Sequence, residues 1–583
     1  MFSSSAAAGL ISLILAYTLF KRLTRPSLSM VRGPPSPSFV FGNLIELFQR
    51  PVGEADFAWQ SQYGNVVRLK SILGVGPLYF CISIRSSAAF NPQEDRLLIS
   101  DPKALHKVLN TSTYGYPKLP NLRVLSRTIN GEGLLWADGE DHKRQRSIML
   151  PGFGLKECKA FLPISKDCAD SISMKWMETI GNSDGQGVVI NVLDWLSRGS
   201  LDAISAAFDV QLNTIENDLH PLAKKYQNFL ADVFGLPPPK QIFILAASKF
   251  VPTRILQWLV DNGSSPRLAR VRDLKIMVTD IAKELVREKA DALLRGQGNT
   301  DIFTLLIKAN KDASTKKRLS DEELLAQMRT LLIAGHETTA ATISFIFLEL
   351  ARHPRVQSRL RDEIRKTETT IRARSDPQLT ATDLDAMPYL NAVIKEGLRF
   401  HPIGTYPIRM SGRDDVLPLS KPVLTESGEM INEVFVPKGT EVMISIPAYN
   451  RCVPPRLNTL QMCNWEWYHS NKDIWGEDAH EFKPDRWLDG AMDDKKLPSI
   501  GVYSNLMTFS SGPRACLGWR FAVIEIQAFL STLVGKFEFA MTDRAERIIR
   551  QPMIVMAPMV EGELDRGVQM PLAVSVAPQD GDI

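Results

Sequence analysis

The ten residues from Phe509 to Gly518, FSSGPRACLG, constrain this chain more than any other stretch. Gly-Pro indicates a turn, and the apolar-rich run from Trp519 to Val534 has the spacing of a helix. Cys516 is therefore expected where a loop enters a helix. The free N–H groups and the positive dipole end of a helix favour a thiolate there. A lone cysteine is more often buried and inert, so its neighbours must decide between the two interpretations.

Those neighbours favour a metal-binding loop. Phe509, Gly512, Arg514, Cys516 and Gly518, at these spacings, resemble the haem-binding loop of the haem-thiolate monooxygenases, the cytochrome P-450 superfamily. The resemblance implies that Cys516 is the axial thiolate ligand of haem b iron. Such a ligand pushes electron density onto iron and favours O–O cleavage. It also implies one mainly α-helical catalytic domain with minor β-sheets, which we expect over residues 39–575.

Composition is that of an ordinary globular protein. The 583 residues are 44% hydrophobic and 23% charged, so a sizeable core is possible. The net charge of +4 is small for this length and argues against nucleic acid as a partner. The six cysteines contain no C-x-x-C pair, which favours neither a zinc site nor a disulfide framework and fits a reducing compartment.

The N-terminus predicts a membrane anchor. Residues 2–20 carry no charge, and Lys21, Arg22 and Arg25 follow directly. Charges after the apolar run indicate a signal-anchor rather than a cleaved signal peptide, which remains the alternative. A basic, proline-rich hinge at 21–38 follows. We expect a single-pass protein of the endoplasmic reticulum membrane with a cytosolic catalytic domain, in contact with membrane lipid.

Two segments interrupt the pattern. Residues 75–93 separate two strand-like segments, 66–74 and 95–100, that would otherwise form a tight hairpin. Residues 452–470 separate two parts of one motif. Both segments are 19 residues long, which suits a small fungal intron, and the codons at their ends permit splice signals. We hypothesise that both are retained introns; genuine surface insertions are the alternative, because long loops in a compact domain are uncommon.

A long helix is predicted from the capping box at Ser320 to about Arg352. In its middle stands Ala-Gly-His-Glu-Thr-Thr, residues 334–339, which resembles the oxygen-side helix of the family. The resemblance implies that Glu337 relays protons, that Thr338 hydrogen-bonds dioxygen or a water, and that Gly335 leaves room over the haem. A kinked core helix is the structural alternative. His336 receives no role.

Several basic residues are predicted to bind the haem propionates. A helix from Asp138 to Ile148 places His142 and Arg146 four residues apart on one face. The family usually has Trp in place of His142. The resemblance therefore implies propionate binding more directly for Arg146 than for His142. Arg409 and Arg514 are further candidates. Residues 111–135 are expected to form a loop over the haem.

A structural brace completes the resemblance. Glu396 and Arg399 share a face of the helix predicted at 388–400, and Arg486 lies in FKPDRW, residues 482–487. In the family such a Glu–Arg–Arg network supports the cysteine loop. A solvent-exposed ion pair is the alternative for Glu396 and Arg399 alone.

The function implied is oxygen insertion into a lipophilic small molecule. The electrons would come from an NADPH–haemoprotein reductase, with cytochrome b5 as a second candidate, since no flavin or nicotinamide fingerprint is present. We expect the reductase to dock near Lys143, Arg144 and Arg520. Fungal sequence style favours a terpenoid or another secondary metabolite as substrate. The alternatives are a xenobiotic, fatty-acid or sterol hydroxylase, a reductase-independent isomerase or dehydratase, and a non-catalytic mis-spliced product.

Overall fold

The computed structural model describes residues 28–73, 93–183, 187–217, 220–226, 229–295, 301–451, 472–490, 492 and 499–578. The predicted anchor at 2–20 lies outside these residues. So do the whole of 452–470 and all but the last residue of 75–93.

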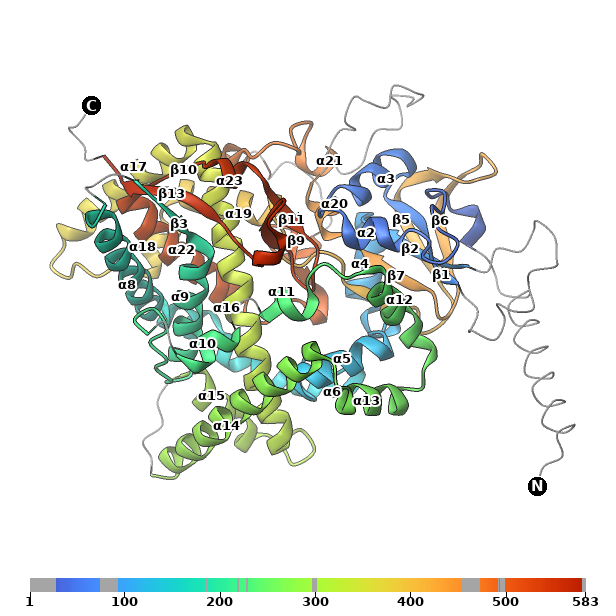
Figure 1. The fold of residues 1–583 in the computed structure, drawn as a ribbon, viewed down its shortest axis with the longest axis horizontal. Helices are drawn as coiled ribbons and strands as arrows, with labels where there is room; N and C mark the ends of the chain where they lie inside the picture. Colours follow the sequence, from blue (N-terminus) through green and yellow to red (C-terminus); the bar gives the residue numbers. More distant parts are fainter. Residues whose placement is uncertain are drawn as a thin grey trace, which may run out of the picture.

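The described chain is mainly helical, as predicted, with several small sheets (Figure 1). The helices of ten residues or more are α5 (Pro120–Asn130), α6 (Gly139–Met149), α8 (Leu162–Gly181), α9 (Val192–Ala206), α13 (Thr253–Asn262), α14 (Pro266–Leu294), α15 (Ile302–Asp312), α16 (Asp321–Arg352), α17 (Pro354–Arg372), α19 (Pro388–Phe400) and α22 (Trp519–Lys536).

The shorter helices connect these and cover the sheets. They are α2 (Leu44–Gln49), α3 (Ala55–Tyr63), α4 (Pro102–His106), α7 (Leu155–Ala160), α10 (Pro221–Tyr226), α11 (Phe229–Phe234), α12 (Pro239–Ala247), α18 (Ala381–Asp385), α20 (Ile446–Asn450), α21 (Lys472–Trp475) and α23 (Asp543–Glu546).

Helix α16 runs through the middle of the molecule and packs against α9, α14, α19 and α22 (Figure 1). Its predicted start is confirmed: the Ser320 hydroxyl accepts from the Glu323 N–H, and the Glu323 carboxylate accepts from the Ser320 N–H. It ends before His353, as predicted. Among the described residues α16 is the one helix long and apolar enough to cross a bilayer, but 72% of its apolar window is buried inside the protein.

A four-stranded sheet lies to one side in the order β1 (Val66–Leu73), β2 (Gln93–Ile99), β7 (Glu441–Ile444) and β4 (Ile408–Met410). β1 pairs with β2 in antiparallel register, with Lys70 opposite Asp95, so the two strand-like segments around 75–93 are paired as expected. β7 joins β2 in parallel and β4 in antiparallel orientation. This arrangement places Arg409 on the edge strand.

The remaining strands form small antiparallel sheets. A three-stranded sheet has the order β10 (Phe537–Ala540), β13 (Pro571–Val576) and β3 (Val188–Asn191). Hairpins join β5 (Asp415–Leu424) to β6 (Met430–Val436), β8 (Gly501–Tyr503) to β9 (Leu506–Ser511), and β11 (Ile548–Gln551) to β12 (Ala557–Val560).

The prediction of a loop over 111–135 was wrong, because this segment contains α5. Pro120 is the first residue of that helix, and Gly131 follows its end with a φ of 84°. Proline at the first helical position and glycine just after the last are helix boundaries. The same two residue types, taken without the apolar Val124 and Ile129 between them, had indicated a loop.

Gly335 lies at a close contact between two helices. A Cβ atom on Gly335 would lie 2.7 Å from Cγ1 of Ile204 on α9. Glycine at this position therefore allows α9 to approach α16 closely; the expected space over the haem stays a prediction.

Candidate active site

Cys516 lies between β9 and α22, as the sequence predicts. Its N–H donates a 2.8 Å hydrogen bond to the Phe509 carbonyl, which closes the loop. Gly512 has a φ of 65°, and a Cβ there would lie 2.3 Å from the Leu109 carbonyl oxygen, so no larger residue fits. Gly518 is the residue before the first turn of α22.

The thiol of Cys516 is accessible although protein surrounds it. Burial raises the pKa of this thiol, and the Gly518 N–H and the Arg146 guanidinium act in the opposite direction. Burial therefore outweighs the helix N-terminus, which by itself would favour a thiolate. A coordinated metal ion would reverse this balance, because it deprotonates a ligating thiol.

Partly buried cations gather around Arg514, two residues before Cys516. The backbone N–H of Lys118 donates to Asp138, and the Arg514 guanidinium also contacts that carboxylate. Burial, Arg409 and Arg514 together lower the pKa of Lys118 to about 7. Burial and Arg514 lower the pKa of Arg409 to about 10. These cations destabilise one another, so the cluster favours an anionic ligand.

Arg146 and Arg514 are held by backbone oxygens. The Arg146 guanidinium donates to the Ala515 carbonyl at 2.8 Å, next to Cys516. The Arg514 guanidinium donates to the Tyr116 carbonyl at 3.0 Å, while its buried Nε has no hydrogen-bond partner among the described residues. Two carboxylates such as haem propionates would supply the missing acceptors and the missing negative charge.

His142 is buried near this cluster, and its Nδ1 lies 3.0 Å from the Tyr114 hydroxyl. Burial and the neighbouring cations, Lys118 first, lower the pKa of His142 to about 3. The ring is therefore neutral at physiological pH. A neutral imidazole can donate one hydrogen bond but adds no positive charge to the cluster.

Glu337 and Thr338 lie at the middle of α16, beside an accessible part of an otherwise buried helix. Ala334, one turn before Thr338, is exposed, and the Thr338 hydroxyl donates to its carbonyl at 2.7 Å. The side chain of Glu337 is 14% exposed. It lines a pocket of about 260 Å³ together with residues of α9, α10 and β12.

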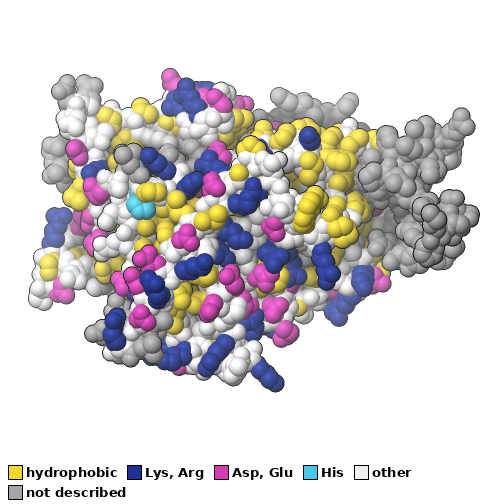
Figure 2. Space-filling view, turned by 60° about the horizontal axis from the view of Figure 1, so that its bottom comes forward, with side chains coloured by type: hydrophobic (Ala, Val, Ile, Leu, Met, Phe, Trp, Pro, Cys, Tyr) yellow, Lys and Arg dark blue, Asp and Glu magenta, His cyan; other side chains and the backbone are white. Residues whose placement is uncertain are grey.

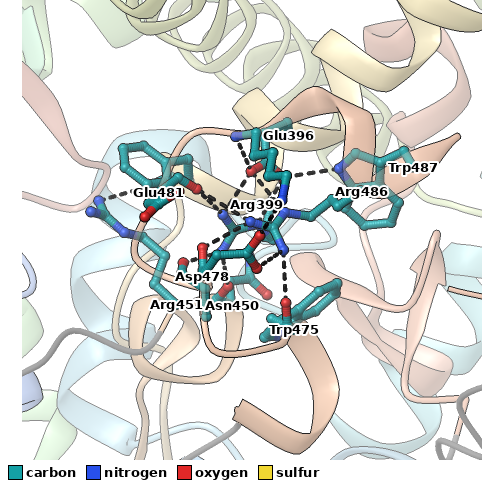
Figure 3. A network of polar contacts seen from close by, with 12 residues as sticks. Glu396, Arg399, Asn450, Arg451, Trp475, Asp478, Glu481, Arg486 and Trp487 are labelled. Carbon is teal, nitrogen blue, oxygen red and sulfur yellow. Dashed lines mark hydrogen bonds and ion pairs between the residues drawn. The ribbon is translucent and has the colours of Figure 1, made fainter. Parts of the chain in front are cut away.

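The predicted Glu–Arg–Arg network is present and buried (Figure 3). Arg399 donates two parallel 2.8 Å hydrogen bonds to the Glu396 carboxylate. Arg486 donates a third of 3.0 Å, and Trp487 a fourth of 2.9 Å. Burial alone would raise the pKa of Glu396, but Arg399 and Arg486 outweigh it and hold this pKa below its usual value.

Asn450 connects this network to the cysteine loop. Arg399 donates to the Asn450 carbonyl at 3.0 Å. The Asn450 side chain donates to the Thr508 hydroxyl at 2.8 Å and accepts from the Met507 N–H at 3.1 Å. Both residues belong to β9, the strand that leads to Cys516. The network thus sets the position of the loop through the backbone and side chain of Asn450.

Three contributing residues were not found from the sequence. Lys118 lies just before α5, in the segment predicted as a loop, and its Nζ bonds the carbonyls of residues 134, 135 and 137. Asp138 was recognised as the first residue of a predicted helix, but nothing in the sequence indicated that it would also contact Arg514. Asn450 lies two residues before the segment 452–470 that interrupts its motif.

The comparisons agree with this geometry. A protein-family model described as Cytochrome P450 matches residues 90–452 and 457–562. Cytochrome P450 monooxygenase 205 of Postia placenta is 32% identical over 585 residues, which cover 98% of this chain and 97% of that protein. Cytochrome P450 monooxygenase claU of Ampulloclitocybe clavipes is 31% identical over 98% of this chain and 96% of that protein.

The residues present fit the cofactor of this family. An accessible thiol beside Arg146 suits iron, and the cation cluster with an unsatisfied Arg514 Nε suits the propionates. The chain belongs to the cytochrome P450 family, whose monooxygenases bind haem b through a cysteine thiolate.

Proposed function

We propose that this monooxygenase oxidises a lipophilic small molecule in a fungal secondary-metabolite pathway, with a terpenoid as the preferred substrate class. The observation that carries the proposal is the accessible Cys516 next to Arg146, in the loop whose Arg514 belongs to a partly buried cluster of cations. The fungal origin of the similar monooxygenases supports the setting.

The chain's own side chains hold the cofactor in this proposal. Cys516 ligates iron, and Arg146, Arg409, Arg514 and His142 hold the propionates. Bound haem supplies the chemistry that inserts one oxygen atom of dioxygen into the substrate and reduces the other to water. Phe509 packs beside the loop, with its ring edge-on to Tyr503.

Glu337 and Thr338 deliver protons on the oxygen side. The Thr338 hydroxyl hydrogen is directed to the Ala334 carbonyl, so its oxygen lone pairs are available to accept a hydrogen bond from a water molecule. Glu337 lies between this face of α16 and the 260 Å³ pocket. Its carboxyl group can take a proton from water in the pocket and pass it toward Thr338.

A membrane location has support from α12 and α13. These helices and their connection expose a set of large apolar side chains: Phe243, Ile244, Leu245, Phe250, Ile255, Trp258 and Leu259. A patch of this kind marks an interaction surface. We propose that it rests in the endoplasmic reticulum membrane beside the anchor at 2–20, so that a lipophilic substrate enters from the bilayer.

Reductase docking is proposed at the face near Cys516. Lys143 is exposed there, and Arg520 stacks on Trp519 at 4.3 Å. Arg144 is bound to Glu323 of α16, and Lys143 is bound to Glu140 at 2.6 Å, so Arg520 is the better candidate. Elsewhere, on the face shown in Figure 2, Lys and Arg are intermixed with Asp and Glu, which offers no broad basic surface for nucleic acid.

A reconstituted assay tests the proposal. Purified full-length protein in lipid vesicles is combined with an NADPH–haemoprotein reductase and a panel of terpenes, fatty acids and sterols. We expect a thiolate-type carbon monoxide difference spectrum and a product from a terpene only when reductase and NADPH are present. Product without reductase would favour an isomerase or dehydratase, and absence of the thiolate spectrum would favour a non-catalytic product.

A further inference from the structure

His336 is a buried polar residue in the middle of α16 that the proposed mechanism leaves unexplained. It precedes Glu337 and lies about 200° around the helix from Thr338, so it faces away from the oxygen side. Its side chain is 0% exposed. A polar ring in such a place costs stability unless its nitrogen atoms are hydrogen-bonded.

One ring nitrogen of His336 is satisfied and the other is not. Nδ1 lies 2.7 Å from the Leu332 carbonyl oxygen, which can only accept, so the proton of the neutral ring is on Nδ1. Burial lowers the pKa of His336 to about 4, and the ring stays neutral. Nε2 then carries a lone pair and has no hydrogen-bond partner among the described residues. It lies 3.8 Å from Oε1 of Glu337.

Tyr226 of α10 closes this site from the other side. Its ring meets the His336 ring edge-on, with 4.6 Å between the ring centroids. Its buried hydroxyl has no hydrogen-bond partner in the part of the chain that the structure describes. Glu337 contributes, after burial, to a raised pKa of Tyr226, so the carboxyl group and the hydroxyl are near each other.

The 260 Å³ pocket connects these groups to water. Tyr226 and Glu337 both line it, and it has room for several water molecules, since each occupies about 30 Å³ in the liquid. The other charged groups that line it come from α9, α10 and the segment before β13: Asp194, Arg198, Lys224 and Arg566.

We propose that His336 is a positioning residue that holds the proton of Glu337. A small rotation of the Glu337 side chain lets its protonated carboxyl group donate to Nε2 of His336, while Nδ1 stays bound to Leu332. When Glu337 releases this proton toward Thr338, the resulting carboxylate is reprotonated from bulk solvent through the pocket water next to the Tyr226 hydroxyl. The imidazole remains neutral throughout. The inference rests on the role proposed above for Glu337.

Infrared spectroscopy of the haem-loaded protein tests the contact directly. The C=O stretching band of the protonated Glu337 carboxyl group is identified as the band that Glu337→Gln removes. We expect His336→Phe, which keeps the ring shape but removes both nitrogens, to move this band toward the position of a free carboxylic acid. His336→Gln offers one donor and one acceptor, so it should restore the original position in part. An absent band in the unmodified protein, or a band that His336→Phe leaves in place, would overturn the proposal.

A double-mutant cycle tests whether His336 acts through Glu337. With reductase and NADPH, the fraction of consumed NADPH that appears as hydrogen peroxide is measured in H₂O and D₂O. We expect His336→Phe to raise this fraction, and the double variant with Glu337→Gln to match Glu337→Gln alone. Tyr226→Phe, which removes one oxygen atom and keeps the ring packing, should raise the fraction to a smaller extent.

The outcomes distinguish a failure of the His336 inference from a failure of the role proposed for Glu337. Additive effects of His336→Phe and Glu337→Gln would show that His336 acts through packing, which contradicts the inference. If Glu337→Gln changes neither the peroxide fraction nor its solvent isotope effect, the role proposed for Glu337 fails, while the infrared result still decides the hydrogen bond. Carbon monoxide difference spectra confirm that each variant is folded and loaded with haem. If His336→Phe does not fold or bind haem, His336→Gln replaces it in both experiments.

Discussion

The guanidinium of Arg399 donates a 3.0 Å hydrogen bond to the backbone oxygen of Asn450, 51 residues further along the chain. The same nitrogen donates to the Ala479 carbonyl at 2.6 Å. One side chain on α19 thus holds together the two stretches on either side of 452–470. Asn450 is in turn hydrogen-bonded to β9, the strand that leads to Cys516. Arg399 therefore helps to fix the position of the cysteine loop.

Glu396→Ala should therefore prevent stable haem binding rather than only slow turnover. The substitution leaves Arg399 and Arg486 buried without their carboxylate, which costs about 3–5 kcal/mol. Haem content and the carbon monoxide difference spectrum measure the effect. Asp485→Ala is the control, since it breaks the exposed pair with Arg359 and should change stability by less than about 1 kcal/mol. A Glu396→Ala protein with normal spectrum and stability would refute the brace.

Gly335→Ala should destabilise the protein through α9. The new Cβ would lie 2.7 Å from Ile204 Cγ1, and overpacking of a core typically costs about 1–3 kcal/mol. This cost is partly offset by about 1 kcal/mol from the better helix propensity of alanine. The unfolding midpoint of the haem-loaded protein measures the net change.

Ile204→Ala provides the matched test of that contact. The space it opens should accept the new methyl group, so the double variant should be more stable than the sum of the single effects predicts. Additive effects would mean that Gly335 is required for another reason, such as space on the oxygen side.

Glu525 should make stability depend on pH. Burial on α22 raises its pKa to about 8, and the Ser200 hydroxyl opposes this only in part. From about pH 5 to pH 8 the folded protein keeps a proton that the unfolded chain has released, so the free energy of unfolding falls as pH rises, by about 1.4 kcal/mol per unit. Below the ordinary pKa of a glutamate both states are protonated and the effect vanishes.

Unfolding midpoints measured at several pH values test this expectation. Glu525→Gln keeps the shape and removes the titrating group, so the decline between pH 5 and 8 should become smaller. Glu178→Gln, at an exposed position of α8, should leave the decline as it was. Equal slopes in the Glu525→Gln variant and the unmodified protein would contradict the prediction.

A variant that lacks 75–93 and 452–470 should fold and bind haem at least as well as the full chain. At the first junction Lys70 and Asp95 already form a 2.5 Å ion pair across β1 and β2, so the shortened chain leaves a short hairpin connection. At the second, Trp475 donates to the Tyr449 carbonyl at 2.8 Å, so the flanking stretches are in contact. Haem content per polypeptide measures the outcome.

Loss of haem binding in this variant would favour genuine insertions over retained introns. Sequencing of mature transcripts decides the question independently. If both segments are present in every transcript, the retained-intron hypothesis is wrong, whatever the variant does.

The local parts of this protein could be predicted from the sequence. The capping box at Ser320, Pro388 at the start of α19 and the FSSGPRACLG loop all depend on residues close together in the chain, where helix termini and turns are decided. The motifs also placed Glu396, Arg399 and Arg486 in one network, because the family resemblance supplied the pairing that spacing alone could not. Helix α5 was missed since its boundary residues are also loop formers.

What required the tertiary structure is the environment of each group. Burial raises the pKa of Cys516 in spite of the helix that follows it. The fold also places Lys118 near arginines such as Arg409 and Arg514 that are far away in the sequence. Gly335 meets Ile204, and His336 is bound to Leu332 and packed against Tyr226, so that its Nε2 has no hydrogen-bond partner in the described part of the chain. These properties depend on desolvation and on contacts between distant segments, which only packing decides. The sequence by itself determined which residue types stand in the cysteine loop and in the middle of α16. The fold decided which charges, protons and neighbours these residues have.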